Sequence, residues 1–410
     1  MTSGTVQVYR GLAGLQSCTL ETVLGGLEQA RLPFVPAFAP DRIALIGKFA
    51  AAIQKDRRWR EVAPVLALAF WLRKAAITRM ADAFRARAHS RSIATGRGIA
   101  FHLPPQNVDT LFLYSWAIAF ACGNTNVVRL PEQISPAMTA LLDPLIALLD
   151  EAGSPDLFLT YPRGDAAANA QLSAIADCRL VWGGDAKVEL FHQWPVRLAG
   201  KSLAFSDRYS HAILSARAVS QLDDAELDQL AKRLHDDIRL FDQQACSSPH
   251  TIHLVDADQV GLDGIRNLLE RLDAIARRTP AIDPAHGMAK FAASCTLAAR
   301  DLVTAVKRLS NETTVVELVE GESRGAPIGG GFLSLRIAPS LSAVAETLSS
   351  RDQTLTHFGL EEAAFASFAA QAAARGVARL VPVGGALDFD QLWDGYDLVG
   401  ELTRAVRSAA

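Results

Sequence analysis

The stretch HLPPQNVDTLFLYSWAIAFACGNTNVVRLPEQISP, residues 102–136, decides the fold of this chain. It begins in a short apolar run that ends in a Pro-Pro loop, and it continues into an apolar segment, 111–122, with the composition of a buried helix. A Gly-Asn turn leads to a second apolar run, 126–130, and Ser135-Pro136 is typical of the start of another helix. A strand, a helix, a strand and a helix in this order predict a βαβ unit of a parallel sheet.

The same alternation continues on the carboxyl side of this stretch. Three further apolar runs have the length of strands: DLFLTYP at 156–162, CRLVWGG at 178–184 and SHAILSA at 210–216. Helical patterns separate the earlier runs. The repeated strand–loop–helix cycle predicts an α/β fold with a doubly wound, Rossmann-type domain of the kind that binds nucleotides.

A second α/β domain is expected after this one. An acidic helical segment, 220–241, runs into FDQQACSSPH, and HTIHLVDA at 250–257 alternates like a strand. Helices are expected to follow to about Leu309, after which two strand-like runs flank a Gly/Ser-rich loop at 321–331. The closing residues predict a strand, a Gly384-Gly385 turn and a last helix.

These patterns predict three regions. Residues 1–95 are expected to be mainly helical, 96–214 to form the nucleotide-binding domain, and 215–383 to form the second α/β domain. Residues 1–95 and 384–410 are expected to pack on the nucleotide-binding domain. A chain of 410 residues is too long for one ordinary core, which agrees with two domains.

Composition narrows the classes of function. Half of the residues are apolar, and the net charge is −3, so no electrostatic feature favours nucleic acid as a partner. The five cysteines are scattered and no CxxC pair occurs, which argues against a disulfide framework or a zinc site and predicts a reducing, cytoplasmic location. No signal peptide is recognisable, and the longest apolar run, 12 residues, is shorter than the roughly 20 that a membrane span needs.

The order of motifs in residues 102–136 closely resembles the aldehyde dehydrogenase superfamily: a Pro-x-Asn loop, an apolar helix, Gly-Asn-Thr, a strand, then basic-x-x-Glu-Gln. Within it, NVVRLP, QQACSSP, QTLTHFGL and WDGYDLVGELTRAVR are most similar to the acyl-CoA reductases of the bacterial bioluminescence type, the LuxC-like fatty acid reductases. The resemblance covers about residue 98 to the end of the chain. It implies that 96–214 is the NAD(P)-binding domain and that 215–383 is the catalytic domain, which carries the cysteine.

This resemblance implies a nucleophile and an oxyanion donor. Cys246 stands where the family has its catalytic cysteine, and its small polar neighbours leave room for a carbonyl. A thiolate near neutral pH needs a depressed pKa or polar stabilisation. Asn107 matches the asparagine whose side chain, with the backbone N–H of the cysteine, holds the oxyanion, although an asparagine here could also cap the following helix. The other four cysteines, Cys18, Cys122, Cys178 and Cys295, are interpreted as buried structural residues.

The resemblance also implies a cofactor site. Pro105 belongs to the Pro-x-Asn loop, and Arg129 and Glu132 stand where the family holds the adenosine ribose. The planar fork of an arginine suits a 2′-phosphate, so NADPH is preferred and NADH remains possible; a solvated ion pair between the two residues is the structural alternative. Gly183 and Gly184 replace the family's motif before the helix that meets the pyrophosphate.

One departure from the family predicts the reaction. Hydrolytic members carry a glutamate that activates water, but the corresponding positions here are Arg197 or about Phe205-Ser206. Without this base an acyl-cysteine would resist water, so we expect NADP-dependent reduction of an acyl thioester to an aldehyde. A proton donor is not identifiable; His250 and His357 are candidates, and a structural histidine is the alternative for both.

The resemblance further implies an acyl donor and self-association. The donor would be an acyl-CoA, an acyl carrier protein or an acyl-protein synthetase, with a fatty or an aromatic acyl group, and a homo-oligomer is expected. Two alternatives stay open: an acyltransferase that uses the same cysteine, and a scaffold subunit of an acid-reductase complex without hydride transfer of its own.

Overall fold

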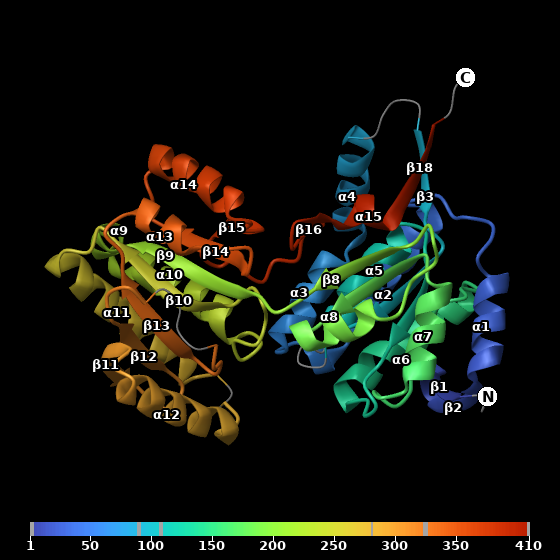
Figure 1. The fold of residues 1–410 in the computed structure, drawn as a ribbon, viewed down its shortest axis with the longest axis horizontal. Coiled ribbons are helices and arrows are strands. Elements are labelled where there is room, and N and C mark those ends of the chain that lie inside the picture. The colour runs from blue at the N-terminus through green and yellow to red at the C-terminus, as the bar shows by residue number, and fades with distance from the viewer. Residues whose placement is uncertain (1–3, 88–91, 106–109, 280–281, 323–326, 408–410) are drawn as a thin grey trace. The chain divides into compact units, whose positions relative to one another are not determined.

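The computed structural model describes residues 4–87, 92–105, 110–279, 282–322 and 327–407 (Figure 1). The chain forms two compact units. The first contains Met1–Ser206, Phe389–Leu392 and Tyr396–Ala410, and the second contains Asp207–Asp388 and Trp393–Gly395.

The first unit is built on a seven-stranded sheet in the order β2-β1-β6-β5-β4-β7-β8. Strand β1 is antiparallel to β2 and β6, while β6, β5, β4, β7 and β8 are mutually parallel. The strands are β1 (Thr5–Tyr9), β2 (Leu15–Thr19), β4 (Ile99–Leu103), β5 (Thr125–Arg129), β6 (Leu157–Thr160), β7 (Cys178–Trp182) and β8 (Lys201–Phe205). The parallel part confirms the predicted α/β fold.

Helices connect the parallel strands of this sheet and precede them in the chain. They are α1 (Leu20–Gln29), α2 (Pro40–Lys55), α3 (Ala63–Trp71), α4 (Lys74–Arg87), α5 (Leu111–Ala121), α6 (Pro136–Glu151), α7 (Ala166–Ile175) and α8 (Asp185–His192), with short 3-10 turns η1 (Gly11–Ala13) and η2 (Arg57–Trp59). The expected buried helix is α5, in which every residue from Phe112 to Ala121 is buried. Helix α6 begins as expected, because the Ser135 hydroxyl accepts the Met138 N–H and Pro136 occupies the first turn.

The Gly-Asn-Thr turn between α5 and β5 has a structural role. Asn124 is fully buried; its Oδ1 accepts the backbone N–H of Arg97, and its Nδ2 donates to the carbonyls of Ala119 and Leu402. Gly123 has φ +97°, and a Cβ there would come within 2.3 Å of a backbone oxygen. Only glycine fits this turn, which ties the end of α5 to the start of β4 and to the C-terminal segment.

The two ends of the chain differ from the expectation. Residues 1–95 supply strands to the sheet through β1 and β2, and β3 (Ser92–Gly96) pairs with β18 (Thr403–Arg407) in an antiparallel ribbon. The expected last helix is only α15 (Leu398–Leu402), and the arginine-rich end continues as β18. The side-chain pattern of 403–407 is compatible with a strand as well as with a helix. Pairing with β3 selects the strand. A short hairpin, β16 (Leu392–Trp393) and β17 (Tyr396–Asp397), precedes α15.

The second unit contains another seven-stranded sheet, in the order β11-β12-β13-β10-β9-β14-β15. All neighbouring pairs are parallel except β11 with β12. Its strands are β9 (Tyr209–Ser215), β10 (Pro249–Val255), β11 (Val303–Arg308), β12 (Thr314–Leu318), β13 (Phe332–Ile337), β14 (Asp352–Phe358) and β15 (Arg379–Pro382). Its helices are α9 (Ala216–Ser220), α10 (Asp224–Arg239), α11 (Gln259–Ala276), α12 (Pro284–Ala299), α13 (Leu341–Thr347) and α14 (Glu362–Ala374).

Two predictions are wrong in this region. The border expected after residue 214 lies after Ser206, because β9 pairs with β10 and β14 of the second sheet. The helices expected up to Leu309 end at Ala299, because residues 303–308 pair with β12 as an antiparallel edge strand. Strand pairing over long sequence distances decides the first case, and a local pattern does not contain it. In the second case β11 and β12 are consecutive in the chain and form an antiparallel hairpin, which was not recognised in the sequence.

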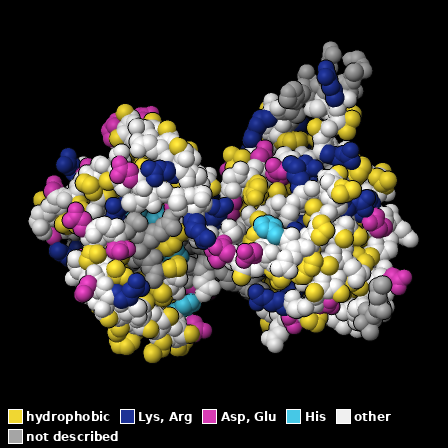
Figure 2. All heavy atoms as spheres, viewed as in Figure 1, with side chains coloured by type: hydrophobic (Ala, Val, Ile, Leu, Met, Phe, Trp, Pro, Cys, Tyr) yellow, Lys and Arg dark blue, Asp and Glu magenta, His cyan; other side chains and the backbone are white. Residues whose placement is uncertain are grey.

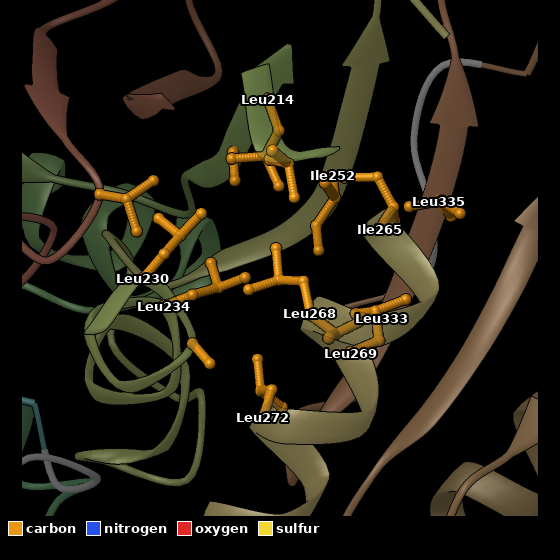
Figure 3. Close-up of a cluster of buried hydrophobic side chains, with 14 of the residues drawn as sticks. Leu214, Leu230, Leu234, Ile252, Ile265, Leu268, Leu269, Leu272, Leu333 and Leu335 are labelled. Carbon is orange, nitrogen blue, oxygen red and sulfur yellow. The ribbon is translucent and has the colours of Figure 1, made fainter. Parts of the chain in front are cut away.

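One face of the second sheet is covered by α10 and α11. One buried cluster contains Leu230 and Leu234 of α10, Leu268 and Leu272 of α11, and Ile252 of β10 (Figure 3). The cap of α10 is a capping box between Asp223 and Glu226. This core holds α10 and β10 together, and the connection between them is the segment that carries Cys246.

The surface in Figure 2 mixes side chains of both charge signs over each unit. No helix among the described residues is long and apolar enough to cross a membrane.

Candidate active site

Cys246 lies in the tight connection between α10 and β10. The chain leaves α10 through a turn in which Asp242 and Gln243 have φ values of +51° and +63°, and Ser248 N–H then donates to the Ala245 carbonyl at 2.9 Å. Two consecutive left-handed residues that are not glycine are costly unless the surroundings hold them.

The Gln243 side chain supplies much of that support. It is buried, and its Nε2 donates to the carbonyls of Pro249 at 2.8 Å and Phe332 at 3.0 Å. Its Oε1 accepts the Gly331 N–H at 3.0 Å. One side chain therefore fastens the Cys246 connection to the starts of β10 and β13.

Ser210 of β9 holds Cys246 from the other side. Its hydroxyl donates to the Cys246 carbonyl at 2.7 Å and accepts the Thr354 N–H of β14 at 3.2 Å. The cysteine peptide is thus fixed to β9 and, through the Ser210 hydroxyl, to β14.

The thiol of Cys246 is not activated at rest. Part of the residue is accessible to solvent, but the sulfur is closely surrounded. Burial, followed by the nearby Asp394 carboxylate, raises its pKa to about 12; hydrogen bonds from the Gln353 side chain and from the Cys246 backbone N–H lower the pKa. The polar stabilisation expected for a thiolate is therefore present, but it is outweighed by burial.

The pKa values of both histidine candidates are lowered, which favours the neutral imidazole. Burial, with a smaller effect of His211, lowers the pKa of His250 to about 4, so its imidazole is neutral near pH 7. Burial also lowers the pKa of His357, whose ring lies 4.2 Å from that of Phe365. Both histidines belong to strands of the sheet, β10 and β14.

The other cysteines divide into two groups. Cys122 and Cys178 are buried, and burial raises the pKa of both thiols, to about 12 for Cys178. Cys295 is exposed and Cys18 is partly exposed, so the interpretation of these two as buried residues is wrong. Helix α12, which carries Cys295, has Lys290 as its buried residue, and the sequence pattern did not show this exposure.

The proposed oxyanion donor Asn107 lies outside the described residues. Pro105, which belongs to the same loop, follows the carboxyl end of β4 and lines a cavity of about 10 Å³ together with Arg129 and Met138. Carboxyl ends of parallel strands are where α/β sheets bind nucleotides. The structure thus brings Pro105 and Arg129 together at the expected edge.

Arg129 and Glu132 do not form the solvated ion pair that was the alternative to a cofactor site; each side chain has a different partner. The Arg129 Nη2 donates to the Tyr161 carbonyl at 3.1 Å, and its guanidinium lies over the Tyr161 ring at 4.7 Å. Its Nε is buried without a hydrogen-bond partner. Glu132 instead accepts the backbone N–H of Arg163 at 2.8 Å.

Lys187 of α8 is a residue that sequence reasoning missed. Its Nζ donates to the carbonyls of Leu103, Pro104 and Trp182, at 2.8 to 2.9 Å. Burial, followed by the charges of Arg129 and Arg163, lowers its pKa to about 7. A lysine on an exposed-looking helix gave no sequence signal, because its target is the backbone of another strand.

The glycines before α8 leave space for the Lys187 side chain. Gly183 has φ +148°, and a Cβ there would lie 2.8 Å from Cδ of Lys187. Gly184 is the N-cap of α8. The pair therefore lets the lysine cross back to the end of β4, close to where Arg129 lies.

The positions that correspond to the missing base have structural contacts. Arg197 forms ion pairs with Glu28 and Asp177. Phe205 stacks on Trp182 with ring centroids 3.6 Å apart. Neither residue can activate water.

A family model described as acyl-CoA reductase (LuxC) matches residues 74–406. No curated protein matches the chain by sequence. Among solved structures, aldehyde dehydrogenase 21 from Physcomitrella patens is similar with a TM-score of 0.69 and 12% identity, over 99% of this chain and 95% of that one.

Two further structures show the same fold. An NAD-dependent benzaldehyde dehydrogenase from Corynebacterium glutamicum has a TM-score of 0.63 and 14% identity, over 99% and 95% of the two chains. Glyceraldehyde-3-phosphate dehydrogenase GapN from Methanocaldococcus jannaschii, complexed with NADP, has a TM-score of 0.64 and 14% identity, over 94% and 93%. The family match extends over most of the chain and the fold is that of aldehyde dehydrogenases, so this chain belongs to the LuxC acyl-CoA reductase family.

Proposed function

We propose that this protein reduces an acyl thioester to an aldehyde with NADPH, through an acyl group held on Cys246. The observation that carries the proposal is the fastened connection around Cys246, with Gln243 and Ser210 fixing it from two sides. A cysteine with a purely structural role does not require an immobilised, partly accessible turn.

The first half-reaction transfers the acyl group. The Cys246 sulfur attacks the thioester carbonyl carbon, the bond from that carbon to the donor sulfur breaks, and the thiol proton leaves with the departing thiolate. The oxyanion would be held by the Cys246 backbone N–H and, by resemblance, by Asn107. Because the resting thiol has a raised pKa, the enzyme would protect itself from side reactions until a donor binds.

The second half-reaction is a reduction. Arg129, Lys187 and Pro105 surround the edge where a nicotinamide dinucleotide would bind, and the unpartnered Nε of Arg129 offers a donor to an anionic group. The cofactor, when bound, supplies a hydride to the acyl carbon. Cys246 then leaves as a thiol after one proton is taken up, and the aldehyde is released.

Arg129 is the residue that favours NADPH over NADH. Its positive charge and that of Arg163 both act on Lys187 and lower the pKa of that lysine. A 2′-phosphate would neutralise part of this charge, whereas a ribose hydroxyl would not. The acyl donor is proposed to be acyl-CoA or an acyl-carrying protein in the cytoplasm, and the active form is proposed to be a homo-oligomer.

The experiment is a product analysis with a panel of fatty and aromatic acyl-CoA esters, NADPH and NADH. The proposal expects NADPH oxidation in equal amount to aldehyde and free CoA. Formation of the carboxylic acid without NADPH oxidation would make the protein a thioesterase. Exchange of the acyl group between thiols, with NADPH present and unused, would favour acyl transfer.

A further inference from the structure

The amide of Gln353 and the carboxylate of Asp394 form a buried pair beside Cys246. The Nε2 of Gln353 donates to the Asp394 Oδ1 at 2.7 Å. Gln353 is fully buried and the Asp394 side chain is 2% exposed. A buried amide and carboxylate of this kind are costly to keep unless they serve the structure or the site.

The pair lies next to Cys246, because the Ser210 hydroxyl bonds both the Cys246 carbonyl and the N–H of Thr354, the residue after Gln353. The Gln353 side chain hydrogen-bonds the Cys246 thiol and favours its charged form, while the Asp394 charge opposes it. The Gln353 Oε1 is buried without a hydrogen-bond partner. The amide therefore presents its donor end to both neighbours and leaves its acceptor end unused.

The carboxylate explains this orientation. An ionised carboxylate only accepts, so it selects Nε2 over Oε1 as the atom of Gln353 that faces it. Arg208 lies 3.7 Å from the same Oδ1, and burial raises the pKa of Asp394 against the influence of Arg208, Gln353 and Arg379.

The backbone around Asp394 is held in place. Asp394 has φ +51°, and Arg379 lies over the ring of the preceding Trp393 at 4.7 Å. Arg379 also donates to the carbonyls of Ala386 and Asp388, at 3.0 and 2.8 Å. The carboxylate itself is held by its contacts with Gln353 and Arg208.

We propose that the Gln353 amide is the donor that stabilises the Cys246 thiolate, and that Asp394 positions this amide by accepting one of its N–H groups. This inference rests on the proposed role of Cys246 and adds two residues to it. Gln353 acts on the sulfur directly, and Asp394 acts through Gln353. Asp394 also opposes the thiolate by its charge, so the two residues have opposite effects.

The test measures the rate at which iodoacetamide alkylates Cys246 between about pH 7 and about pH 10, since only the thiolate reacts. Peptide mass spectrometry separates Cys246 from Cys295, whose rate in the same sample is an internal reference. Gln353→Leu should lower the alkylation rate of Cys246 about tenfold, which is the effect of losing one hydrogen bond to a charged group. Gln244→Leu, whose amide contacts His286 instead, is the matched control and should leave the rate unchanged.

Two substitutions at Asp394 separate its charge from its positioning role. Asp394→Asn removes the charge and keeps an acceptor, so Cys246 should react faster than in the wild type. Asp394→Leu removes both the charge and the acceptor, so Cys246 should be alkylated several-fold more slowly in this variant than in Asp394→Asn. That difference should vanish when Gln353 is also leucine, because no amide remains to be positioned.

The results decide the inference without a substrate. Equal rates for the wild type and Gln353→Leu, equal rates for the two Asp394 variants, or a wild-type Cys246 that never reacts would each overturn it. If Gln353→Leu fails to fold, Gln353→Met, which has a similar length and lacks the donor, should slow alkylation in its place. If these changes in alkylation rate are observed but no acyl group is transferred to Cys246, the proposed function is rejected. The inference that Gln353 stabilises the thiolate would still stand.

Discussion

The hydroxyl of Ser210 links the peptide of Cys246 to β14, because it donates to the Cys246 carbonyl at 2.7 Å and accepts the Thr354 N–H at 3.2 Å. The cysteine therefore depends on a strand that precedes it by 36 residues and on one that follows it by more than 100. This contact fixes the carbonyl side of the cysteine, whereas its thiol is influenced by Gln353 and Asp394.

Ser210→Ala should impair acyl transfer while leaving cofactor binding intact. The substitution leaves the Thr354 N–H and the Cys246 carbonyl without their partner, which costs about 1–3 kcal/mol when such groups are buried. We expect kcat to fall about tenfold and NADPH affinity to stay unchanged. Steady-state kinetics and NADPH fluorescence titration measure the two effects. Ser220→Ala, whose hydroxyl donates to the nearby Arg217 carbonyl on the surface, is the control. A kcat equal to that of this control would contradict the role of Ser210.

Gln243→Ala should destabilise the second unit. It removes three hydrogen bonds of a buried side chain and leaves backbone groups at Pro249, Phe332 and Gly331 unpaired. A loss of about 2–4 kcal/mol in the free energy of unfolding is expected. Urea denaturation followed by circular dichroism measures it. Gln244→Ala at the exposed neighbouring position should cost less than about 0.5 kcal/mol, and equal losses in the two variants would show that the Gln243 contacts do not support the turn.

Arg129→Gln should weaken NADPH binding more than NADH binding. The guanidinium has a buried Nε without a partner and positively charged neighbours, so its loss removes a charge-assisted hydrogen bond of about 1.5–3 kcal/mol to a 2′-phosphate. The Kd for NADPH should rise about 10- to 100-fold, and that for NADH less than about threefold. Isothermal titration with both cofactors measures the change, with Arg266→Gln on the surface of the second unit as control. Equal changes for both cofactors would remove Arg129 from the phosphate site.

The rate of acyl transfer should rise with pH. The pKa of the Cys246 thiol is raised to about 12, so the thiolate is the minor form at neutral pH and its fraction grows about tenfold for each pH unit below that pKa. Pre-steady-state release of CoA, without NADPH, should therefore increase between about pH 6.5 and about pH 8.5 with a slope near one on a logarithmic scale. A plateau that begins below about pH 7 would mean that donor binding lowers the pKa of the thiol.

The fold was largely predictable because residues 102–136 contain several local signals in the right order. The buried helix α5, the cap of α6 at Ser135 and the strand that ends at Arg129 all follow from patterns of a few residues. Strand β9 was assigned to the wrong sheet, since the choice depends on its pairing with β10 and β14. Neighbouring strands that are distant in sequence leave no trace in a local pattern.

The candidate site was predictable at Cys246 and much less so around it. Its position came from the resemblance of QQACSSP. Gln353 and Asp394 belong to QTLTHFGL and WDGYDLVGELTRAVR, which carry the same resemblance, but they come more than 100 residues later and their spacing does not show that they lie beside the cysteine. Lys187 was missed for the same reason, because its partners are backbone carbonyls of β4 and β7. The raised pKa of the thiol depends on burial by all these elements, and a sequence does not show burial of a single atom.

The central claim is that Cys246 carries the acyl group, and intact-protein mass spectrometry tests it most directly. The protein would be mixed with each acyl-CoA of the panel without NADPH, beside Cys246→Ala and the exposed-cysteine control Cys295→Ala. The account predicts a mass gain of one acyl group on the wild type and on Cys295→Ala, none on Cys246→Ala, and release of this mass as aldehyde when NADPH is added. An adduct that persists in Cys246→Ala, or one that NADPH does not discharge, would contradict it.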